Sequence, residues 1–444
     1  MKLSRYNYLK KINNDTVFFN ALTCALALVD DNFIKAYSAI ENNSFNESEF
    51  DKELIDNMKL SGCIIEDNFN ELDYIAYCRN NSKYNTNSFA LTIAPTLACN
   101  FRCKYCFENH SKEVMTDSSQ KAILDFSEEY IKNAHDFSVT WYGGEPLLAR
   151  DIIFSLSEKF QELCKINNVN YNAFIITNGS LIEDRDLELF KKYNIRGAQV
   201  TIDGPKEIHD KRRINIKKES TYETIIENIN KLLNNEYDVI ARVNIDKDNI
   251  EYIDDLLTNL KERIDKYSEL KIDFGKVSVF TEICKTIESS CFDNEQYAQT
   301  MLPLYEKTIN MGFTVNKMTV YPTVKFNYCC ADYTTSFVVD VNGNLYKCWN
   351  HVGNISESCG SVKEKDKIIN PTFLKWIQRD PLLFQKCRDC NMLPICMGGC
   401  PDLSVKSLDK TPVCDTVKFN LESVIEFYYN HLKDGEENEN TCCS

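Results

Sequence analysis

The sequence has no hydrophobic run long enough to cross a membrane. The longest apolar stretch near its start, around residues 21–29, has about half the length that a bilayer requires. Residues 1–16 carry charge, but no apolar segment follows them, so we see no secretory signal. We therefore expect a cytoplasmic protein with no membrane partner.

Histidine and net positive charge are also scarce. The five histidines are scattered without a His-x-x-x-His arrangement, which leaves a mononuclear metal centre without support. Acidic residues outnumber basic ones by 66 to 51, for a net charge of −15. Non-specific nucleic-acid binding needs clustered Lys and Arg, so this balance argues against a nucleic-acid partner.

Cysteine, in contrast, is abundant, with 20 in 444 residues. Such a number indicates either a disulfide framework or thiolate ligands for metal. A reducing cytoplasm disfavours disulfides, so metal binding is the better interpretation. The length allows two or three domains, and 25 Phe and 23 Tyr suffice for sizeable cores.

The middle of the chain, 89–316, predicts an α/β fold. Amphipathic helical windows such as 151–165 separate strand-like runs, which implies a parallel sheet curled toward a partial (β/α)6 TIM-like barrel. In such folds the chemistry gathers at the carboxyl ends of the strands. The expected strands are 90–94, 139–142, 173–177, 198–202, 239–244 and 271–280.

A cysteine cluster directly follows the first barrel strand. Cys99, Cys103 and Cys106 are spaced so that one loop could offer three thiolates to a [4Fe–4S] cube and leave its fourth iron open. A zinc site or three buried structural cysteines are the alternatives. The pattern, with Tyr105 before its third cysteine, resembles the signature of the radical S-adenosylmethionine (radical SAM) superfamily.

Segments at the next two strand ends extend the resemblance. Gly143-Gly144-Glu145-Pro146 resembles the GGEP segment that holds the amino group of the methionine moiety, although it could be an ordinary tight turn. Asn178, in Thr177-Asn178-Gly179, matches a segment that lines the cofactor pocket.

The fourth and fifth strand ends continue the pattern. Thr201 opens Thr-Ile-Asp-Gly-Pro, followed by His209-Asp210 and Arg213, which resembles the Ser-x-Asp-Gly-Pro and His-Asp-x-x-Arg segments of peptide- and protein-modifying members. The resemblance implies that Thr201 and Arg213 contact the cofactor carboxylate and that Arg242 lines the pocket. For Arg213, a solvated arginine at a helix start is the alternative.

The resemblance also implies an activity. A reduced cluster would pass one electron to S-adenosylmethionine, which would break into methionine and a 5′-deoxyadenosyl radical that abstracts hydrogen from the substrate. An external one-electron reductant of the flavodoxin or ferredoxin type would supply the electron.

A second cysteine region follows residue 317. Its cysteine order, with Gly343 four residues before Cys348, resembles the SPASM extension and implies two further [4Fe–4S] clusters, three in all; a pair of zinc knuckles is the alternative. By that resemblance one cluster takes Cys387, Cys390, Cys396 and Cys414. The other takes Cys330, Cys348 and Cys400, and its fourth iron takes Cys329, a substrate thiol or nothing.

Trp349 departs from a related pattern. Anaerobic sulfatase-maturing relatives carry an aspartate base directly after the cysteine that corresponds to Cys348, and tryptophan cannot accept a proton. Sulfatase maturation therefore loses ground.

The two ends of the chain are read from weaker signals. Strand-like runs at 5–9 and 16–20 and the entry 60–65 give residues 1–85 a loose resemblance to the winged-helix domain that captures a leader peptide as an added strand. A generic stabilising extension is the alternative. Residues 80–88 are expected to be a linker, 317–430 the SPASM domain and 431–444 a disordered acidic tail.

These observations lead to a radical SAM oxidoreductase that modifies a ribosomally made precursor peptide with a leader. Thioether links from cysteine are the expected product. The alternatives are a protein-modifying oxidase of the sulfatase-maturase type and a non-catalytic iron–sulfur electron carrier; a carrier, however, has no need of a cofactor pocket. The substrate residue, the general base and the oligomeric state have no readable signal in the sequence.

Overall fold

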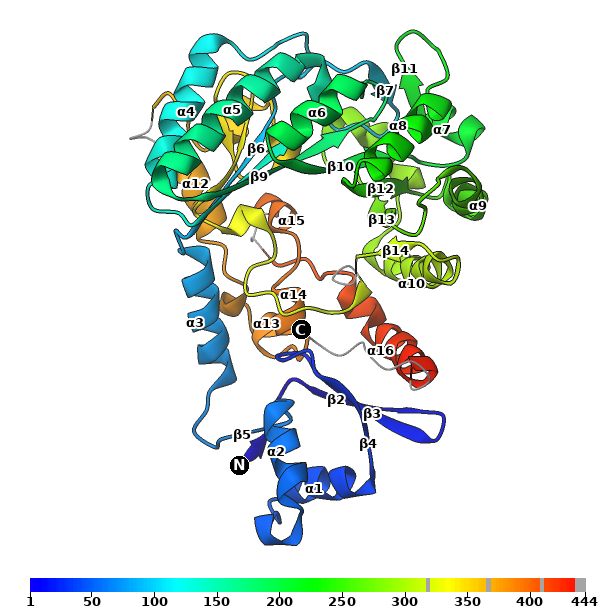
Figure 1. Cartoon of the computed structure of the whole chain (residues 1–444). Coiled ribbons are helices and arrows are strands. Elements are labelled where there is room, and N and C mark those ends of the chain that lie inside the picture. The colour runs from blue at the N-terminus through cyan, green and yellow to red at the C-terminus, as the bar shows by residue number, and fades with distance from the viewer. Residues whose placement is uncertain (317–319, 365–368, 408–410, 436–444) are drawn as a thin grey trace.

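The computed structural model describes residues 1–316, 320–364, 369–407 and 411–435. Its centre is a nine-stranded sheet in the order β14-β13-β12-β10-β9-β8-β6-β15-β16, parallel except where β16 joins β15 (Figure 1). The predicted α/β fold with a parallel, barrel-like sheet is confirmed. The strands are β6 Ser88–Ile93, β8 Asp136–Trp141, β9 Asn170–Thr177, β10 Ile195–Thr201, β12 Asp238–Ile245, β13 Lys271–Lys276, β14 Thr314–Val315, β15 Ser336–Val339 and β16 Leu345–Tyr346.

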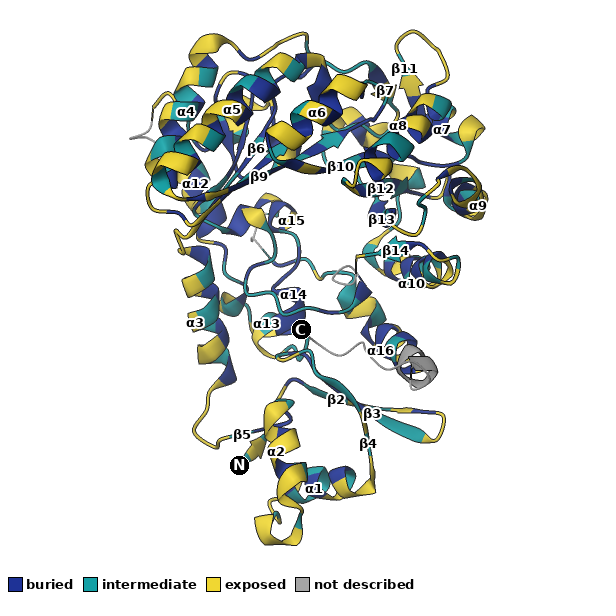
Figure 2. Cartoon of the chain, viewed as in Figure 1, coloured by how far each residue is buried: buried dark blue, intermediate teal, exposed yellow. Residues whose placement is uncertain are grey.

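Helices follow the strands and cover one face of the sheet (Figures 1 and 2). Their apolar sides join the alternate side chains of the strands in one large core. The predicted helix at 151–165 lies within α5. The helices are α4 Asp117–Ile131, α5 Arg150–Asn167, α6 Asp184–Lys192, α7 Lys206–Arg212, α8 Tyr222–Asn234, α9 Ile253–Arg263 and α10 Asn294–Asn310.

The sixth predicted strand, 271–280, is too long. β13 ends at Lys276, and the last hydrogen bond to the neighbouring strand is the one that Val277 N–H donates to Ile245 O. The apolar residues that follow leave the sheet because they line cavities at its carboxyl edge.

The C-terminal region shares the sheet with the barrel. β15 pairs in parallel with β6, Phe337 opposite Leu91, so the sheet crosses the predicted boundary at residue 317. Beyond β16 this region consists of short helices and turns. These helices are α12 Pro371–Ile377, α13 Gln385–Arg388, α14 Leu393–Cys396, α15 Pro401–Lys406 and the longer α16 Val417–Gly435.

The N-terminal module is a three-stranded antiparallel sheet, β2-β3-β4, with helices beside it. The strand predicted at 5–9 begins later, because residues 5 and 6 form a turn, whereas β3 closely matches the predicted 16–20. The elements are β1 Lys2–Leu3, β2 Asn7–Ile12, β3 Asp15–Asn20, β4 Leu26–Val29, α1 Asp31–Glu41, α2 Lys52–Leu60, β5 Ile64–Ile65 and α3 Glu71–Lys83.

The predicted linker 80–88 is wrong in its first half. α3 runs on to Lys83, and both Arg79 and Lys83 are buried although they are basic. Lys83 Nζ donates to the carbonyls of Ile377 and Arg379, at 2.6 and 3.1 Å, so the C-terminal end of α3 is bound to the C-terminal region. A helix whose buried face carries basic side chains lacks the apolar periodicity by which helices are recognised in a sequence.

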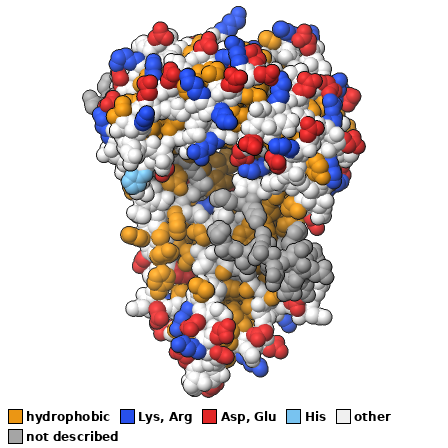
Figure 3. All heavy atoms as spheres, in the orientation of Figure 1, with side chains coloured by type: hydrophobic (Ala, Val, Ile, Leu, Met, Phe, Trp, Pro, Cys, Tyr) orange, Lys and Arg blue, Asp and Glu red, His pale blue; other side chains and the backbone are white. Residues whose placement is uncertain are grey.

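The module also shares a hydrophobic core with the C-terminal region. Phe19 and Ile75 of the module pack in one cluster with Ile395 of α14 and Ile425 of α16. Figure 3 shows hydrophobic side chains gathered below the barrel, whereas charges of both signs intermix over the barrel helices.

The predicted disordered tail 431–444 is corrected at its start, because α16 continues to Gly435. Residues 436–444 lie outside the described part of the chain. Among the described helices, none combines the length and hydropathy of a membrane span.

Candidate functional site

The first cysteine loop lies at the carboxyl edge of the sheet. It leaves β6 and enters β7, Phe101–Cys103, which pairs antiparallel with β11, Arg213–Asn215, so that Cys103 lies opposite Arg213. Within the loop the amide of Phe101 donates to Cys99 Sγ, at 3.3 Å. The chain thus presents the thiols from a ribbon fixed on both sides.

Cys103 lies within electrostatic reach of both Cys99 and Cys106. Burial raises the pKa of Cys99, Cys103 and Cys106, that of Cys106 to about 12, and the charge of Cys103 adds to the shift at the other two. No group of His, Cys, Asp or Glu among the described residues converges as a single-ion site would require. A four-iron cube is ligated at separate irons, so its thiolates need not converge on one point.

Gly143 and Gly144 allow the loop after β8 to lie directly on the cysteine loop. Gly143 has φ +113°, and a Cβ on Gly144 would lie 2.2 Å from Ala98 O. The amide of Glu145 donates to the same carbonyl at 2.8 Å. The two glycines therefore bring the loop after β8 close to the backbone that leads into Cys99.

Glu145 joins three strand ends from a fully buried position. Its carboxylate accepts from the Thr177 hydroxyl at 2.7 Å and from the Asn178 amide at 2.8 Å. Asn178 Nδ2 in turn donates to Asn100 Oδ1 in the cysteine loop, at 2.7 Å. Burial raises the pKa of Glu145, and these hydrogen bonds oppose the shift. The carboxylate is thus already bound by the protein, with lone pairs left for one further donor.

Tyr105 is the centre of a second polar network. Its hydroxyl donates to the buried carboxylate of Asp203 and accepts from Arg213 Nη1 at 2.6 Å and from Asn244 Nδ2 at 3.2 Å. The Asn244 amide also donates to Asp203, at 2.9 Å. Burial raises the pKa of Tyr105 well above its ordinary value, so the phenol keeps its proton. Tyr105 is therefore held by protein groups at the bottom of the barrel mouth.

Arg213 and Arg242 differ in how far their charge is compensated. Arg213 is buried, 3.9 Å from Asp203, and its Nε has no partner among the described residues. Arg242 is ion-paired with Asp273. A Cβ on Gly275 would clash with the Arg242 guanidinium, so that glycine makes room for it.

A cavity of about 260 Å3 opens at this edge of the barrel. Thr201 lines it with Tyr105 and Arg242, from three different strand ends. Trp349 also lines it, and its ring stacks on Tyr142 with centroids 5.6 Å apart. The residue after Cys348 therefore faces the barrel mouth.

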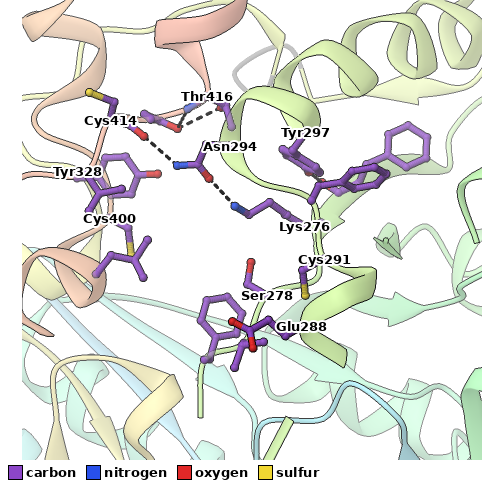
Figure 4. A pocket seen from close by; sticks show the side chains of 18 of the residues that line it. Lys276, Ser278, Glu288, Cys291, Asn294, Tyr297, Tyr328, Cys400, Cys414 and Thr416 are labelled. Atoms are coloured by element: carbon purple, nitrogen blue, oxygen red, sulfur yellow. Dashed lines mark hydrogen bonds between the residues drawn. The ribbon is translucent and has the colours of Figure 1, made fainter. Parts of the chain in front are cut away.

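A larger cavity of about 580 Å3 lies beside the first and shares Arg242, Lys276, Ser278 and Phe280 with it. Figure 4 shows Lys276 and Cys291 on the barrel side and Tyr328, Cys400 and Cys414 on the opposite side. The two cavities therefore connect the barrel mouth to the second cysteine region.

Electrostatic interactions link several cysteines of the C-terminal region. The charges of Cys396, Cys390 and Cys414 contribute to a pKa of about 11 at Cys387, after burial. The charges of Cys400 and Cys330 contribute to the raised pKa of Cys348. Cys329 hydrogen-bonds its neighbour Cys330.

Three site residues escaped sequence reasoning. Asp203 and Asn244 stand inside segments already singled out, so their motifs were the available signal. Asn100 had no signal, because its role arises only when the cysteine loop meets Asn178.

The residues fit an iron–sulfur cluster and S-adenosylmethionine. The thiol of Cys99 lies within electrostatic reach of Arg213, whose buried Nε has no partner among the described residues. Gly143 and Gly144 let the loop after β8 pack against the backbone that leads into Cys99. A buried donor without a partner is costly unless a ligand satisfies it.

Comparison with known families agrees with this geometry. Residues 93–260 match the model of the Radical SAM superfamily. A cysteine-type anaerobic sulfatase-maturating enzyme of Clostridium novyi (strain NT) is 25% identical over 341 residues, covering 70% of this chain and 88% of its own. The radical SAM cyclopropyl synthase TigE of Paramaledivibacter caminithermalis is 22% identical over 482 residues, covering 96% and 95%.

Solved structures share the fold. Native anSMEcpe with bound AdoMet has a TM-score of 0.61 at 19% identity and covers 79% of this chain and 99% of its own. Streptococcus suis SuiB bound to the precursor peptide SuiA has a TM-score of 0.57 at 17% identity and covers 94% and 99%.

Proposed function

This chain carries a Radical SAM domain and is related to anaerobic sulfatase-maturating enzymes, and we propose that it modifies a ribosomally made precursor peptide by linking cysteine sulfur to carbon. A Radical SAM domain implies one [4Fe–4S] cluster and S-adenosylmethionine. The peptide substrate, the thioether product and two auxiliary clusters are the proposal. The edge strand β4 beside a groove in the N-terminal module is the observation that carries it.

In this proposal Cys99, Cys103 and Cys106 hold the first cluster. Arg213 would bind the cofactor carboxylate, and Glu145, which already accepts from Thr177, Asn178 and Leu147, would accept one further hydrogen bond from the amino group. When bound, cluster and cofactor supply a 5′-deoxyadenosyl radical that takes a hydrogen atom from the substrate.

Several other side chains would orient the cofactor and line the pocket. Tyr105, fixed by Asp203, closes the base of the cavity, and Asn178 fixes the cysteine loop. Thr201 and Arg242 line the cavity wall. Together these groups keep bulk water from the reacting atoms.

The auxiliary clusters would occupy the two cysteine groups of the C-terminal region. Cys387, Cys390, Cys396 and Cys414 would hold one, and Cys330, Cys348 and Cys400 the other, with Cys329 or a substrate thiol as its fourth ligand. Support comes from the two sets of mutual charge interactions. The adjoining cavity would bring the modified peptide segment between Cys400 and the barrel mouth.

The N-terminal module offers a peptide site. β4 is the outer strand of its sheet, and a groove of about 1290 Å3 runs beside it, lined by Leu26, Leu28, Phe33 and Leu54 among others. Hydrogen-bonded pairs alternate along an antiparallel ladder, and the amide of Asn20 donates to Ala25 O. By that alternation the N–H groups of Leu26 and Leu28 face the open edge, where an extended leader would add a strand.

Relatives differ in whether they extend over this module. The match to the sulfatase-maturating enzyme covers 70% of this chain, whereas the match to TigE covers 96% and that to peptide-bound SuiB 94%. This coverage and Trp349 in place of a base favour a peptide maturase over a sulfatase maturase. The sulfatase-type reaction remains the second candidate because the chain is also similar to sulfatase-maturating enzymes.

The first experiment tests the product. The anaerobically reconstituted full chain is incubated with S-adenosylmethionine, dithionite and a cysteine-rich precursor peptide. Thioether formation predicts a loss of two hydrogens and of one thiol reactive toward iodoacetamide for each link. A two-hydrogen loss with every thiol still reactive would instead indicate a carbon–carbon bond or oxidation of one side chain, and reaction only with a sulfatase-derived peptide would indicate the sulfatase type.

The second experiment tests the leader site by substitution. Deletion of residues 1–85 would expose the core that the module shares with the C-terminal region, so its failure would be ambiguous. Leu28→Pro removes one outward N–H and leaves the pairing with β3. We expect leader affinity to fall roughly ten-fold or more, and less with Leu28→Ala, which keeps the N–H. Equal affinity in both variants and the wild type would refute strand addition at β4.

A further inference from the structure

The ribbon formed by β7 and β11 has an inner and an outer face. Cys103 and Arg213 lie opposite each other in register and point inward. Because side chains alternate along a strand, Arg102, Lys104 and Ile214 point outward and are exposed. The cysteine loop is therefore one residue away from a free surface.

The outer face is basic. The ion pairs at this corner belong to the buried residues Arg212 and Arg213, and no ion pair to a described residue is found for the outward lysines or for Arg102. Arg102 donates instead to the carbonyls of Cys99 and Phe101, at 2.8 and 2.7 Å, which leaves its charge uncompensated. The exposed basic residues are Arg102, Lys104, Lys211, Lys217 and Lys218.

The same face is partly apolar and stands apart from the peptide groove. Ile214 and Ile216 are 37% and 55% exposed between the basic residues, and the acidic neighbours along the chain are Asp210 and Glu219. Figure 1 shows the ribbon at the top of the barrel, whereas the N-terminal module lies at the bottom. Such a patch is unusual in a chain with a net charge of −15.

We propose that the outer face of the β7–β11 ribbon is the docking surface for an acidic one-electron donor protein. The inference rests on the proposed radical function, which needs an electron at the cluster that Cys103 would help to hold. An acidic flavin or iron–sulfur protein is the occupant whose charge complements the patch. On docking, the donor loses one electron and the cluster gains it, with no proton transferred. Opposite charges would raise the encounter rate, and the isoleucines would exclude water from the contact.

The test compares two reductants on the same reconstituted full-length chain. Flavodoxin, reduced by NADPH and its reductase, requires docking, whereas dithionite does not. We expect Lys104→Glu/Lys217→Glu to lower flavodoxin-driven formation of 5′-deoxyadenosine roughly ten-fold or more at low ionic strength, with the dithionite-driven rate unchanged. Added salt should lower the flavodoxin-driven rate of the wild type and so reduce the difference in rate between wild type and variant.

Two further variants complete the test. Lys159→Glu/Lys165→Glu makes the same charge change on the exposed side of α5 and should leave both rates unaltered. Lys217→Glu/Lys218→Asp avoids the cysteine loop and should again lower only the flavodoxin-driven rate. Equal flavodoxin-driven rates in wild type and both ribbon variants would overturn the docking surface. Absence of dithionite-driven cleavage in the wild type would instead overturn the proposed function.

Discussion

The two cysteine regions of this molecule are built in opposite ways. In the barrel, Cys99, Cys103 and Cys106 come from one short loop. The β7–β11 ribbon and backbone hydrogen bonds fix this loop, which lies beside a large apolar core. In the C-terminal region, the thiols come from segments between Cys330 and Cys414 joined by short helices and turns. The comparison teaches that the barrel presents its three thiols from one hydrogen-bonded loop, whereas the C-terminal region draws its thiols from separate segments that the proposed clusters would join.

Loss of one barrel thiol tests the barrel site most severely. Cys103→Ala should lower 5′-deoxyadenosine formation roughly a thousand-fold or more, because the cluster loses one of three ligands. Far-UV circular dichroism should stay unchanged, since the barrel core does not depend on the cluster. Cys78→Ala on α3 is the matched control, and equal loss of activity there would remove the distinction.

Loss of one C-terminal thiol should separate radical formation from product formation. Cys387→Ala and Cys348→Ala should each remove about four irons per chain. Peptide modification should fall about a hundred-fold while 5′-deoxyadenosine formation stays within roughly three-fold. Iron analysis and mass spectrometry of the peptide measure both. Unchanged iron in both variants would contradict the proposed ligand sets.

Removal of all iron should destabilise the C-terminal cysteine region more than the barrel. With the chelated protein we expect amide hydrogens of 385–406 to exchange roughly thirty-fold faster, because no extended hydrogen-bonded element holds this segment. Amides of β8, β9 and β10 should keep their protection. Hydrogen-exchange mass spectrometry reports both regions in one sample, and equal acceleration in the two would refute the comparison.

Trp349 follows Cys348 in the C-terminal region, but its ring contacts the barrel. Trp349→Ala removes the ring stacked on Tyr142 and should lower peptide modification about ten-fold, with a smaller effect on 5′-deoxyadenosine formation. Trp349→Phe keeps a ring and should recover most of the loss. A larger effect on cofactor cleavage than on the peptide would show that the ring belongs to the cofactor pocket instead.

The sequence predicted the barrel because its signals are local. Alternating strands and helices, and cysteines at fixed spacings, can be read within a short window, and all six expected strands are present. The contribution of β15 to the barrel sheet could not be read, since four residues carry too little pattern to indicate a partner far away. The extension of α3 was missed because Arg79 and Lys83 are buried through hydrogen bonds.

The sequence predicted which residues belong to the candidate site but not the contacts that they make with one another. Motif positions led to Glu145 and Arg213, yet the burial of Glu145 against Thr177 and the partnerless Nε of Arg213 arise from tertiary contacts. The union of two cavities across Lys276 likewise depends on how α10 and the segment after Cys400 pack. Such features follow from the fold as a whole, and no local window contains them.

The single core that joins Phe19 of β3 to Ile395 and Ile425 has a practical consequence for engineering. We expect that the N-terminal module cannot be exchanged between enzymes as a separate unit, because each chimera would place a foreign surface against α14 and α16. A graft that also carries the facing side chains of those two helices should accumulate as intact protein, whereas a simple exchange at residue 85 should precipitate or be degraded.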